Sequence, residues 1–453
     1  MLLKQYHNEK LAHSSYILAG EENCAVIDPS RDIQIYLDEA KMFGVEITHI
    51  LETHLHADFI SGHIDLAKRT GAVIYVPESA DCKFKHIGLK EGDKIKLEDM
   101  ELSVLETPGH TPEHLSYVVK DLGRSDDPVG VFCGDTLFVG DVGRPDLFPG
   151  RAEELAEKLY NSLFNKLMEL PDYCEVYPTH GAGSLCGKAV GAKRRSTIGY
   201  EKRHNKVLQI KDKDKFIQEL TVDMPPAPDH FSRCSAINAK GPVSVDELPD
   251  MKSMSPAEFK KAVNDKVLIV DVRPYDAFGG QFIPGSYNFD FSGNLPTLAG
   301  WILPYDVNIL LVAENRKQAE RAGVYLRRVG LDNITGYLEG GLFAWSNMGY
   351  RTEHIQQVSI IESEKMLEED GATLIDVRRK TVYDEKHIEK AVNIPTPELR
   401  SKYQELDRDK PYLLYCNTGH RSSLAASILK QHHFSQVFNL AGGMTAYNNL
   451  EEV

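Results

Sequence analysis

The chain has 453 residues, of which 42% are hydrophobic and 26% are charged, a composition typical of folded globular proteins. This length predicts two to four domains. A formal net charge of −15 excludes a general affinity for nucleic acid, because binding to the phosphate backbone depends on clustered Lys and Arg.

The first ten residues lack the apolar core and cleavage site of a secretory signal, and no apolar run of membrane-spanning length follows them. We therefore expect a cytoplasmic protein that makes no contact with a membrane. The seven cysteines are odd in number and widely spaced, which predicts reduced thiols rather than a disulfide framework.

Three segments of the first half place possible metal ligands in a loop just after an expected strand, and a fourth loop offers one more. The segments are 47–51 followed by His54, His56 and Asp58, 102–105 followed by His110, 129–133 followed by Asp135, and a fourth loop that contains His180. A rigid strand that ends beside a loop is a common way to direct ligands to one point. The histidines at positions 7, 13, 49, 63 and 86 have no such context, and His114 is a possible neighbour of the site.

One helix and one connector follow in this half. Leucines at positions 155, 159, 163 and 167 predict a helix over 153–170 that packs into the core and ends before Pro171. Three prolines within 225–228 disfavour helix and predict an extended connector. A domain boundary is expected near 225–250.

An internal repeat organises the remainder of the chain. Segment 267–273 recurs as 373–378, and 310–312 recurs as 413–415, with a Gly-Gly pair after each in the same order. Strands alternate with helices in both copies, for example the helices expected over 318–329 and 422–431, which predicts mainly parallel sheets.

The second copy contains a cysteine at a strand-to-helix junction. Strand 412–415 runs into Cys416, and the sequence Cys-Asn-Thr-Gly-His-Arg ends at Arg421. Backbone N–H groups and a helix N-terminus at such a junction stabilise a thiolate. We expect Cys416 to be nucleophilic. In the first copy Ala313 stands at the equivalent position, so that copy has no thiol there.

The order of the metal-ligating motifs in the first half resembles the metallo-β-lactamase superfamily, and the spacing 54, 110 and 135 with Gly143-Arg144-Pro145-Asp146 looks most like its persulfide dioxygenase branch. Phe59 stands where the dinuclear hydrolases have a second histidine. Because phenylalanine cannot ligate a metal, this departure argues against a two-zinc hydrolase of the glyoxalase II type.

Two histidines and one carboxylate with open positions are the arrangement used by non-haem Fe(II) oxygenases. The resemblance implies one Fe(2+) per chain, with His54, His110 and Asp135 as ligands and His56, Asp58 and His180 as hydrogen-bonding partners around them. It also implies that Arg144 orients an anionic substrate. The basic run 193–195 with Lys202 and Arg203 suggests a phosphate-bearing thiol, whereas Gly181 after His180 departs from the glutathione-using members.

The last repeat resembles a rhodanese domain, in which Cys-x-x-Gly-x-Arg follows a strand. The resemblance makes Cys416 the sulfur carrier and Arg421 the organiser of its loop. The intervening residues Asn417, Thr418, Gly419 and His420 are then expected to bind substrate. The tyrosine phosphatases also place an arginine after a catalytic cysteine, but they have one residue more between the two. This difference favours the rhodanese interpretation.

Over its full length the chain resembles the CstB type of fused persulfide dioxygenase and sulfurtransferase. We therefore expect an α/β protein with a metallo-β-lactamase αβ/βα sandwich over 1–240, a rhodanese-like domain without its cysteine over 250–352, and an active rhodanese domain over 355–453. The expected partners are a low-molecular-weight persulfide, O2, sulfite and thiosulfate, together with further copies of the chain in a dimer or tetramer. The alternatives are a glyoxalase II-type thioesterase and a non-catalytic scaffold that carries or senses sulfur.

Overall fold

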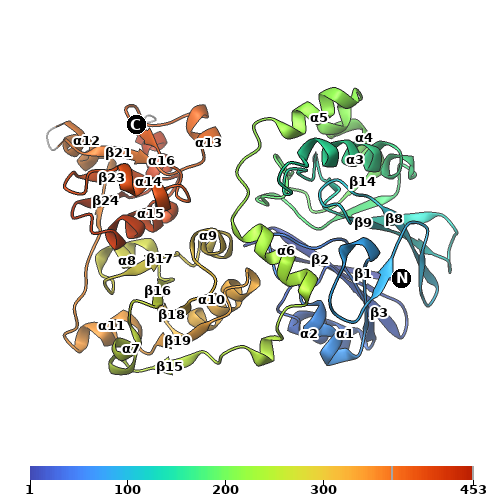
Figure 1. Ribbon diagram of the computed structural model, residues 1–453, viewed down its shortest axis with the longest axis horizontal. Coiled ribbons are helices and arrows are strands. Elements are labelled where there is room, and N and C mark those ends of the chain that lie inside the picture. Colours follow the sequence, from blue (N-terminus) through green and yellow to red (C-terminus); the bar gives the residue numbers. More distant parts are fainter. Residues whose placement is uncertain (369–370, 451–453) are drawn as a thin grey trace. The chain divides into compact units, whose positions relative to one another are not determined.

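The computed structural model describes residues 1–368 and 371–450, and these residues form two compact units. Unit 1 contains Met1–Glu247 and Arg328–Gly330. Unit 2 contains Leu248–Arg327 and the described residues from Leu331 onward. Each unit has its own sheets and its own apolar cores (Figure 1).

Unit 1 contains two six-stranded sheets. The first has the order β1 (Leu2–Asn8), β2 (His13–Ala19), β3 (Asn23–Ile27), β4 (Glu46–Leu51), β5 (Val73–Pro77) and β6 (Ile87–Leu89). The second has the order β14 (Ser196–Thr197), β13 (Glu175–Pro178), β10 (Pro128–Gly134), β9 (Leu115–Asp121), β8 (Met100–Glu106) and β7 (Lys94–Leu97). A small hairpin pairs β11 (Leu137–Phe138) with β12 (Asp141–Val142).

The two sheets of unit 1 are the inner layers of a sandwich. Alternating residues such as Leu18 on β2 and Leu102 on β8 share one buried core between the sheets, because successive side chains on a strand point to opposite faces. The opposite face of the first sheet packs against α1 (Gln34–Phe43) and α2 (His63–Thr70). The opposite face of the second packs against α3 (Ala152–Phe164) and α5 (Lys213–Thr221), so the layers are αβ/βα.

The helix expected over 153–170 is shorter in the structure. Helix α3 ends at Phe164, and a single 3₁₀ turn, Leu167–Glu169, follows after a break at Asn165 and Lys166. Leu167 nevertheless packs in the same core as Leu159 and Leu163. The leucine spacing therefore predicted the buried stripe correctly and the helix end too late. Helices α4 (Ile198–His204) and α6 (His230–Lys240) complete unit 1.

Unit 2 contains two parallel five-stranded sheets with the same strand order. In the first repeat the order is β15 (Lys252–Met254), β19 (Ile334–Leu338), β18 (Asn308–Val312), β16 (Val267–Asp271) and β17 (Ser286–Asn288). In the second repeat it is β20 (Gln356–Val358), β24 (Val437–Leu440), β23 (Tyr412–Tyr415), β21 (Thr373–Asp376) and β22 (Val392–Asn393). The sheets are the ones that the strand–helix alternation predicted.

Helices connect these parallel strands. The first repeat has α7 (Pro256–Ala262), α8 (Tyr275–Gly280), α9 (Leu295–Ile302), α10 (Arg316–Arg328) and α11 (Gly341–Asn347). The second has α12 (Ile360–Glu368), α13 (Lys380–Glu385), α14 (Leu399–Lys402), α15 (His420–Gln431) and α16 (Gly443–Leu450). Helices α10 and α15 each begin two residues before the ranges expected from sequence.

The two repeats also share a buried ion pair. Arg273 binds both carboxylate oxygens of Asp271, and Arg378 binds those of Asp376 in the same way. A buried pair of this kind requires satisfied hydrogen bonds to offset the desolvation of both charges. Its recurrence at the same strand end supports the alignment of the repeats.

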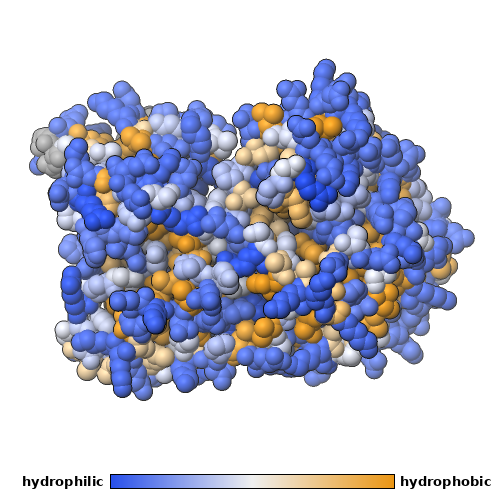
Figure 2. All heavy atoms as spheres, in the orientation of Figure 1, coloured by the Kyte–Doolittle hydropathy of each residue, from blue (hydrophilic) through white to orange (hydrophobic). Residues whose placement is uncertain are grey.

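Hydrophilic side chains cover most of the visible surface of each unit (Figure 2). Within the part of the chain that the structure describes, no helix has both the length and the apolar character needed to cross a membrane.

Candidate functional site

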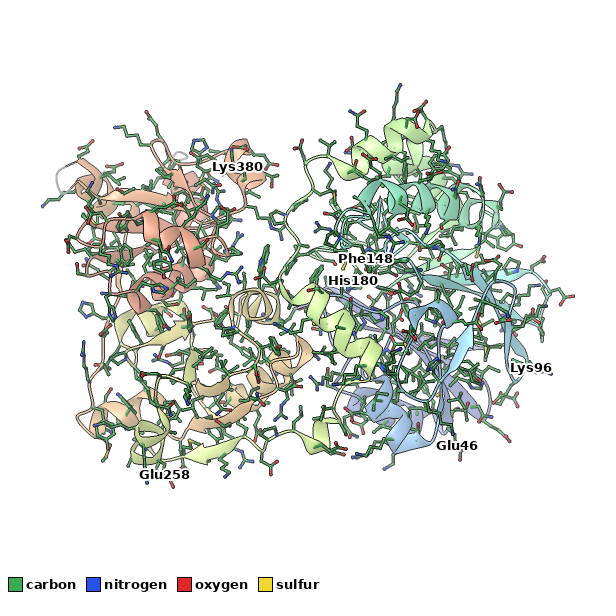
Figure 3. All side chains as sticks on the ribbon, in the orientation of Figure 1. Glu46, Lys96, Phe148, His180, Glu258 and Lys380 are labelled. Atoms are coloured by element: carbon green, nitrogen blue, oxygen red, sulfur yellow. The ribbon has the colours of Figure 1, made fainter. Side chains whose placement is uncertain are left out.

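The expected metal ligands of unit 1 meet at the ends of four strands. Strand β4 leads to His54, β8 to His110, β10 to Asp135 and β13 to His180. All four side chains are buried. In Figure 3 His180 lies within unit 1, whereas Glu46 and Lys96 mark its outer edge.

His54, His110 and Asp135 each offer a ligand atom within 4.8 Å of the other two. The His110 Nε2 atom lies 3.3 Å from Asp135 Oδ2, and His54 Nε2 lies 3.8 Å from the same oxygen. Two histidines and one carboxylate, all buried, suit a divalent transition metal.

The outer nitrogens of both histidines are held by the protein. His110 Nδ1–H donates to the Arg144 carbonyl oxygen at 2.9 Å. The buried Nε2 atom of His110 therefore carries a lone pair, and it has no hydrogen-bond partner. The Thr53 hydroxyl donates to Asp28 and is 2.9 Å from His54 Nδ1, so it can accept that proton. Both imidazoles therefore present Nε2 inward, as metal-bound histidines do when the other nitrogen is hydrogen-bonded. These residues fit a bound metal ion.

Asp135 is prepared to act as an anionic ligand. Although burial opposes its charge, His180 lowers the pKa of the Asp135 carboxyl below its ordinary range. Burial lowers the pKa of His114 to about 3, so this imidazole is neutral and its Nε2 accepts the Asp135 backbone N–H at 2.9 Å. His114 thus fixes the loop that carries the carboxylate.

His180 lies between two carboxylates. Its Nδ1 atom is 2.8 Å from Asp135 Oδ1, and its Nε2 atom is 2.9 Å from Asp58 Oδ2. Against the effect of burial, Asp135 and Asp58 raise the pKa of His180 well above its ordinary value. Since both acceptors are carboxylates, His180 is an imidazolium that donates a proton to each.

His56 does not join the ligand group but forms a second ion pair. Its Nε2 atom lies 3.1 Å from Asp28 Oδ1 and 3.0 Å from Glu52 Oε2. Although burial opposes the charge, Asp28 and Glu52 raise the pKa of His56 to about 10. Phe59 is fully buried and stacks on the His56 ring at a centroid distance of 4.4 Å. An apolar ring and an imidazolium thus lie beside the ligand group.

Arg144 contacts the protein through its entire guanidinium group. Nε and Nη2 donate to the two Asp146 carboxylate oxygens at 2.7 and 2.6 Å, and further bonds reach the carbonyls of Leu185 and Pro225. The side chain is 2% exposed. These contacts support a structural role, and substrate binding by Arg144 stays a prediction.

The basic residues expected to bind a phosphate do not form one cluster of free charges. Lys202 and Arg203 both pair with Asp172, at 2.8 and 3.1 Å. Lys193 lies over the Tyr200 ring, 4.8 Å from its centroid. These contacts do not support the expected binding of a phosphate-bearing thiol.

Several residues near the site carry no signal in the sequence. Asp28 and Glu52 are single carboxylates at strand ends. Cys186 lies in a loop, but its sulfur is within 4.8 Å of ligand atoms of Asp58 and His180. His13 is buried, with its ring 4.0 Å from Phe59, because β2 forms a bridge to His180. Sequence spacing could not reveal these contacts, since strand pairing makes them.

In unit 2 the Cys416 thiol lies at the base of a loop between β23 and α15. Cys416 is 1% exposed, and its Sγ atom accepts the Gly419 N–H at 3.2 Å and the Ser422 hydroxyl at 3.5 Å. Burial alone would raise the pKa of the thiol, but the Arg421 charge and hydrogen bonds from Ser422 and the Thr418 backbone lower it below its ordinary value. The loop therefore favours a thiolate.

The equivalent loop of the first repeat has the same backbone without sulfur. Gly341 and Gly443 both adopt positive φ, at 59° and 49°. A Cβ at Gly341 would come 2.8 Å from the Ala313 carbonyl oxygen, and one at Gly443 would come 2.2 Å from the Cys416 carbonyl oxygen. Ala313 thus occupies the position of Cys416, as the repeat predicted.

Two family comparisons agree with this architecture. The metallo-beta-lactamase superfamily matches residues 9–180, and the rhodanese-like domain matches residues 255–348 and 360–450. The persulfide dioxygenase ETHE1 of Mus musculus is 31% identical over 204 residues, which cover 43% of this chain and 74% of that protein. The chain belongs to the family of persulfide dioxygenase–rhodanese fusion proteins.

Other relatives of this fusion protein extend the comparison. A metallo-beta-lactamase from Staphylococcus aureus subsp. aureus COL has a solved structure with a TM-score of 0.68 and 34% identity, covering 75% of this chain and 99% of that one. A hydroxyacylglutathione hydrolase from Pseudoalteromonas translucida is 28% identical over 259 residues, covering 56% of this chain and 86% of that enzyme. The fold class predicted from sequence is confirmed, and the fusion protein is an enzyme with a metal site.

Proposed function

We propose that this fusion protein oxidises a low-molecular-weight persulfide with O2 at a single Fe(2+) ion and transfers sulfur through Cys416 to yield thiosulfate. The supporting observation is the asymmetry of the site in unit 1. His54, His110 and Asp135 converge on one point, while Phe59 and two imidazolium groups occupy its surroundings. Two histidines and a carboxylate leave open positions for O2 and a sulfur anion.

The bound iron would supply the redox chemistry with O2, and the chain's own residues would set its environment. His54, His110 and Asp135 would hold the ion. His180 would keep Asp135 anionic and oriented through its 2.8 Å contact, since second-sphere partners of this kind orient ligands. The overall reaction is RSSH + O2 + H2O → RSH + sulfite + 2 H⁺, in which the terminal sulfur is oxidised and O2 is reduced.

Cys416 would carry a second sulfane sulfur. Its thiolate attacks the terminal sulfur of a persulfide, the S–S bond breaks, and the released thiolate takes up the proton of the persulfide. Sulfite then attacks the outer sulfur of the Cys416 persulfide, which gives thiosulfate and regenerates the Cys416 thiolate. The hydrogen bonds from Gly419 and Ser422 stabilise the thiolate before and after transfer. The reverse direction, in which thiosulfate charges Cys416, uses the same groups.

Thioester hydrolysis is the second candidate, because hydroxyacylglutathione hydrolases are among the relatives. The Phe59 side chain disfavours it, since a second metal ion would lose a ligand there. The two functions separate by incubating the iron-loaded protein with a small persulfide in air and with a thioester without O2. We expect sulfite or thiosulfate from the first reaction and no thiol release from the second, and the opposite pattern would establish a hydrolase.

A further inference from the structure

The cysteine-less repeat contacts the loop of Cys416 directly. Tyr275, the first residue of α8, places its ring against the backbone of Gly419. A Cβ on Gly419 would lie 2.8 Å from Tyr275 Cζ, and Gly419 has a φ of +106°, which L side chains rarely adopt. The amide that donates to Cys416 Sγ thus belongs to the residue that this ring covers.

The next residue of the loop is also held by the cysteine-less repeat. The His420 ring lies 5.3 Å from the Tyr275 ring, and its Nδ1 atom is 3.3 Å from Ser292 Oγ and 3.7 Å from an Asp290 carboxylate oxygen. Asp290 is buried and accepts the Tyr275 N–H at 2.9 Å and the Ser292 hydroxyl at 2.6 Å. The buried Asp290 carboxylate therefore holds both Tyr275 and Ser292, the two residues of the first repeat that contact the His420 ring.

A third contact comes from the other side of the loop. Burial raises the pKa of the Tyr275 hydroxyl, and the backbone of Gly442 beside it opposes that rise. The neighbouring Gly443 packs on the Cys416 carbonyl, and the Met444 N–H donates to that oxygen at 2.8 Å. Tyr275 thus spans the two segments that enclose the cysteine.

Buried hydrogen bonds fix the two repeats of unit 2 against each other beside this loop. The Ser423 hydroxyl on α15 lies 2.7 Å from Asn288 Oδ1 on β17, and the Asn288 N–H donates to Ser427 Oγ at 3.1 Å. These polar groups are fully buried, so separating them from their partners would leave each without a hydrogen bond. The contact of Tyr275 with the loop is therefore held by a rigid frame.

The arrangement is one-sided. In the last repeat Lys380 aligns with Tyr275, and Pro395 aligns with Asp290. Lys380 pairs with Asp384 on its own helix and lies at the edge of the last repeat in Figure 3. Proline has no carboxylate to offer. The aromatic ring and the acid are thus present only in the repeat that lacks a cysteine, where they face the loop of the repeat that has one.

We propose that the cysteine-less repeat is part of the sulfur-transfer site, with Tyr275, Asp290 and Ser292 as positioning residues that hold the Cys416 loop in shape. This inference rests on the proposed role of Cys416 as the sulfur carrier. It gives the first repeat a role other than that of a spacer. The backbone amide of Gly419 can donate to sulfur only while the Gly419–His420 segment keeps its orientation, and Tyr275 is the side chain packed on that segment.

The test measures the rate at which iodoacetamide alkylates Cys416 in the full-length protein as a function of pH, followed by mass spectrometry of the Cys416 peptide. Alkylation needs no sulfur transfer, so this result stands even if the proposed carrier function fails. We expect Tyr275→Ala to move the midpoint of the rate profile upward by about one pH unit, which corresponds to about tenfold slower alkylation below the midpoint. Tyr275→Leu, with less volume lost, should also move it upward.

Two further variants separate positioning from general destabilisation. Tyr275→Phe retains the ring over Gly419 and should restore the wild-type midpoint. Gln431→Ala removes a bond to the Gly285 carbonyl at the other end of α15 and should leave the profile unchanged. Unchanged midpoints in both Tyr275→Ala and Tyr275→Leu, or an equal shift in Gln431→Ala, would overturn the proposal.

Discussion

Replacement of Arg144 by methionine separates a structural role of this arginine from a substrate-binding role. The guanidinium group forms a two-point ion pair with Asp146 and donates to the carbonyls of Leu185 and Pro225, all within unit 1. The Arg144 backbone carbonyl meanwhile holds His110 Nδ1 at 2.9 Å. Arg144→Met keeps most of the apolar stem and removes every one of the side-chain donors.

The burial of Arg144 sets the expected loss of stability in Arg144→Met. Removing one partner of a fully buried ion pair costs about 3–5 kcal/mol. Because the Asp146 side chain is 23% exposed, water can partly rehydrate the stranded carboxylate, and we expect a loss of about 2–4 kcal/mol in the stability of unit 1. The loop that orients His110 should loosen as well, with a 10–100-fold fall in metal affinity, as is typical when a partner of a ligand is lost.

The assays are urea unfolding of the full-length protein followed by a probe in unit 1, and competition for Fe(2+) with a chelator. The control is Arg151→Met, which breaks an exposed pair with Glu154 and should leave both quantities unchanged. A raised KM for the persulfide with unchanged stability and metal affinity would refute the structural role and establish that Arg144 binds substrate.

Three further predictions concern the metal site of unit 1 and the Cys416 loop of unit 2. Cys416→Ser should leave O2 uptake largely intact and shift the products from thiosulfate toward sulfite, and an unchanged thiosulfate yield would contradict the carrier role. Phe59→His should raise the metal content from one ion per chain toward two in metal analysis after loading, whereas a constant content would show that Phe59 does not exclude the second ion. Since Arg421 lowers the pKa of Cys416, Arg421→Gln should move its alkylation profile to higher pH, so that the variant reacts more slowly at neutral pH; an unmoved profile would contradict that cause.

The sequence predicted the parts of this protein that depend on order along the chain. Loops after β4, β8 and β10 were expected to bring His54, His110 and Asp135 together. The structure does so from both layers of the sandwich, since β4 belongs to the first sheet and β8 and β10 belong to the second. The repeat also predicted two similar domains, and the structure has two sheets with the same strand order.

The sequence could not predict contacts made by pairing and packing between distant segments. Nothing in the sequence around Glu52 or Asp28 indicates that both carboxylates contact His56 and stabilise its protonated form. Nor does the position of Tyr275, in a repeat without a cysteine, indicate that it covers the loop of the other repeat. Such contacts depend on the register of strands and on the packing of two domains.

The most direct test of the central claim is metal analysis of the purified protein coupled to O2 consumption with a small persulfide. We predict one iron ion per chain and one O2 consumed for each sulfite equivalent formed, with uptake lost on chelation and restored by Fe(2+). Two zinc ions per chain without O2 uptake would contradict the account.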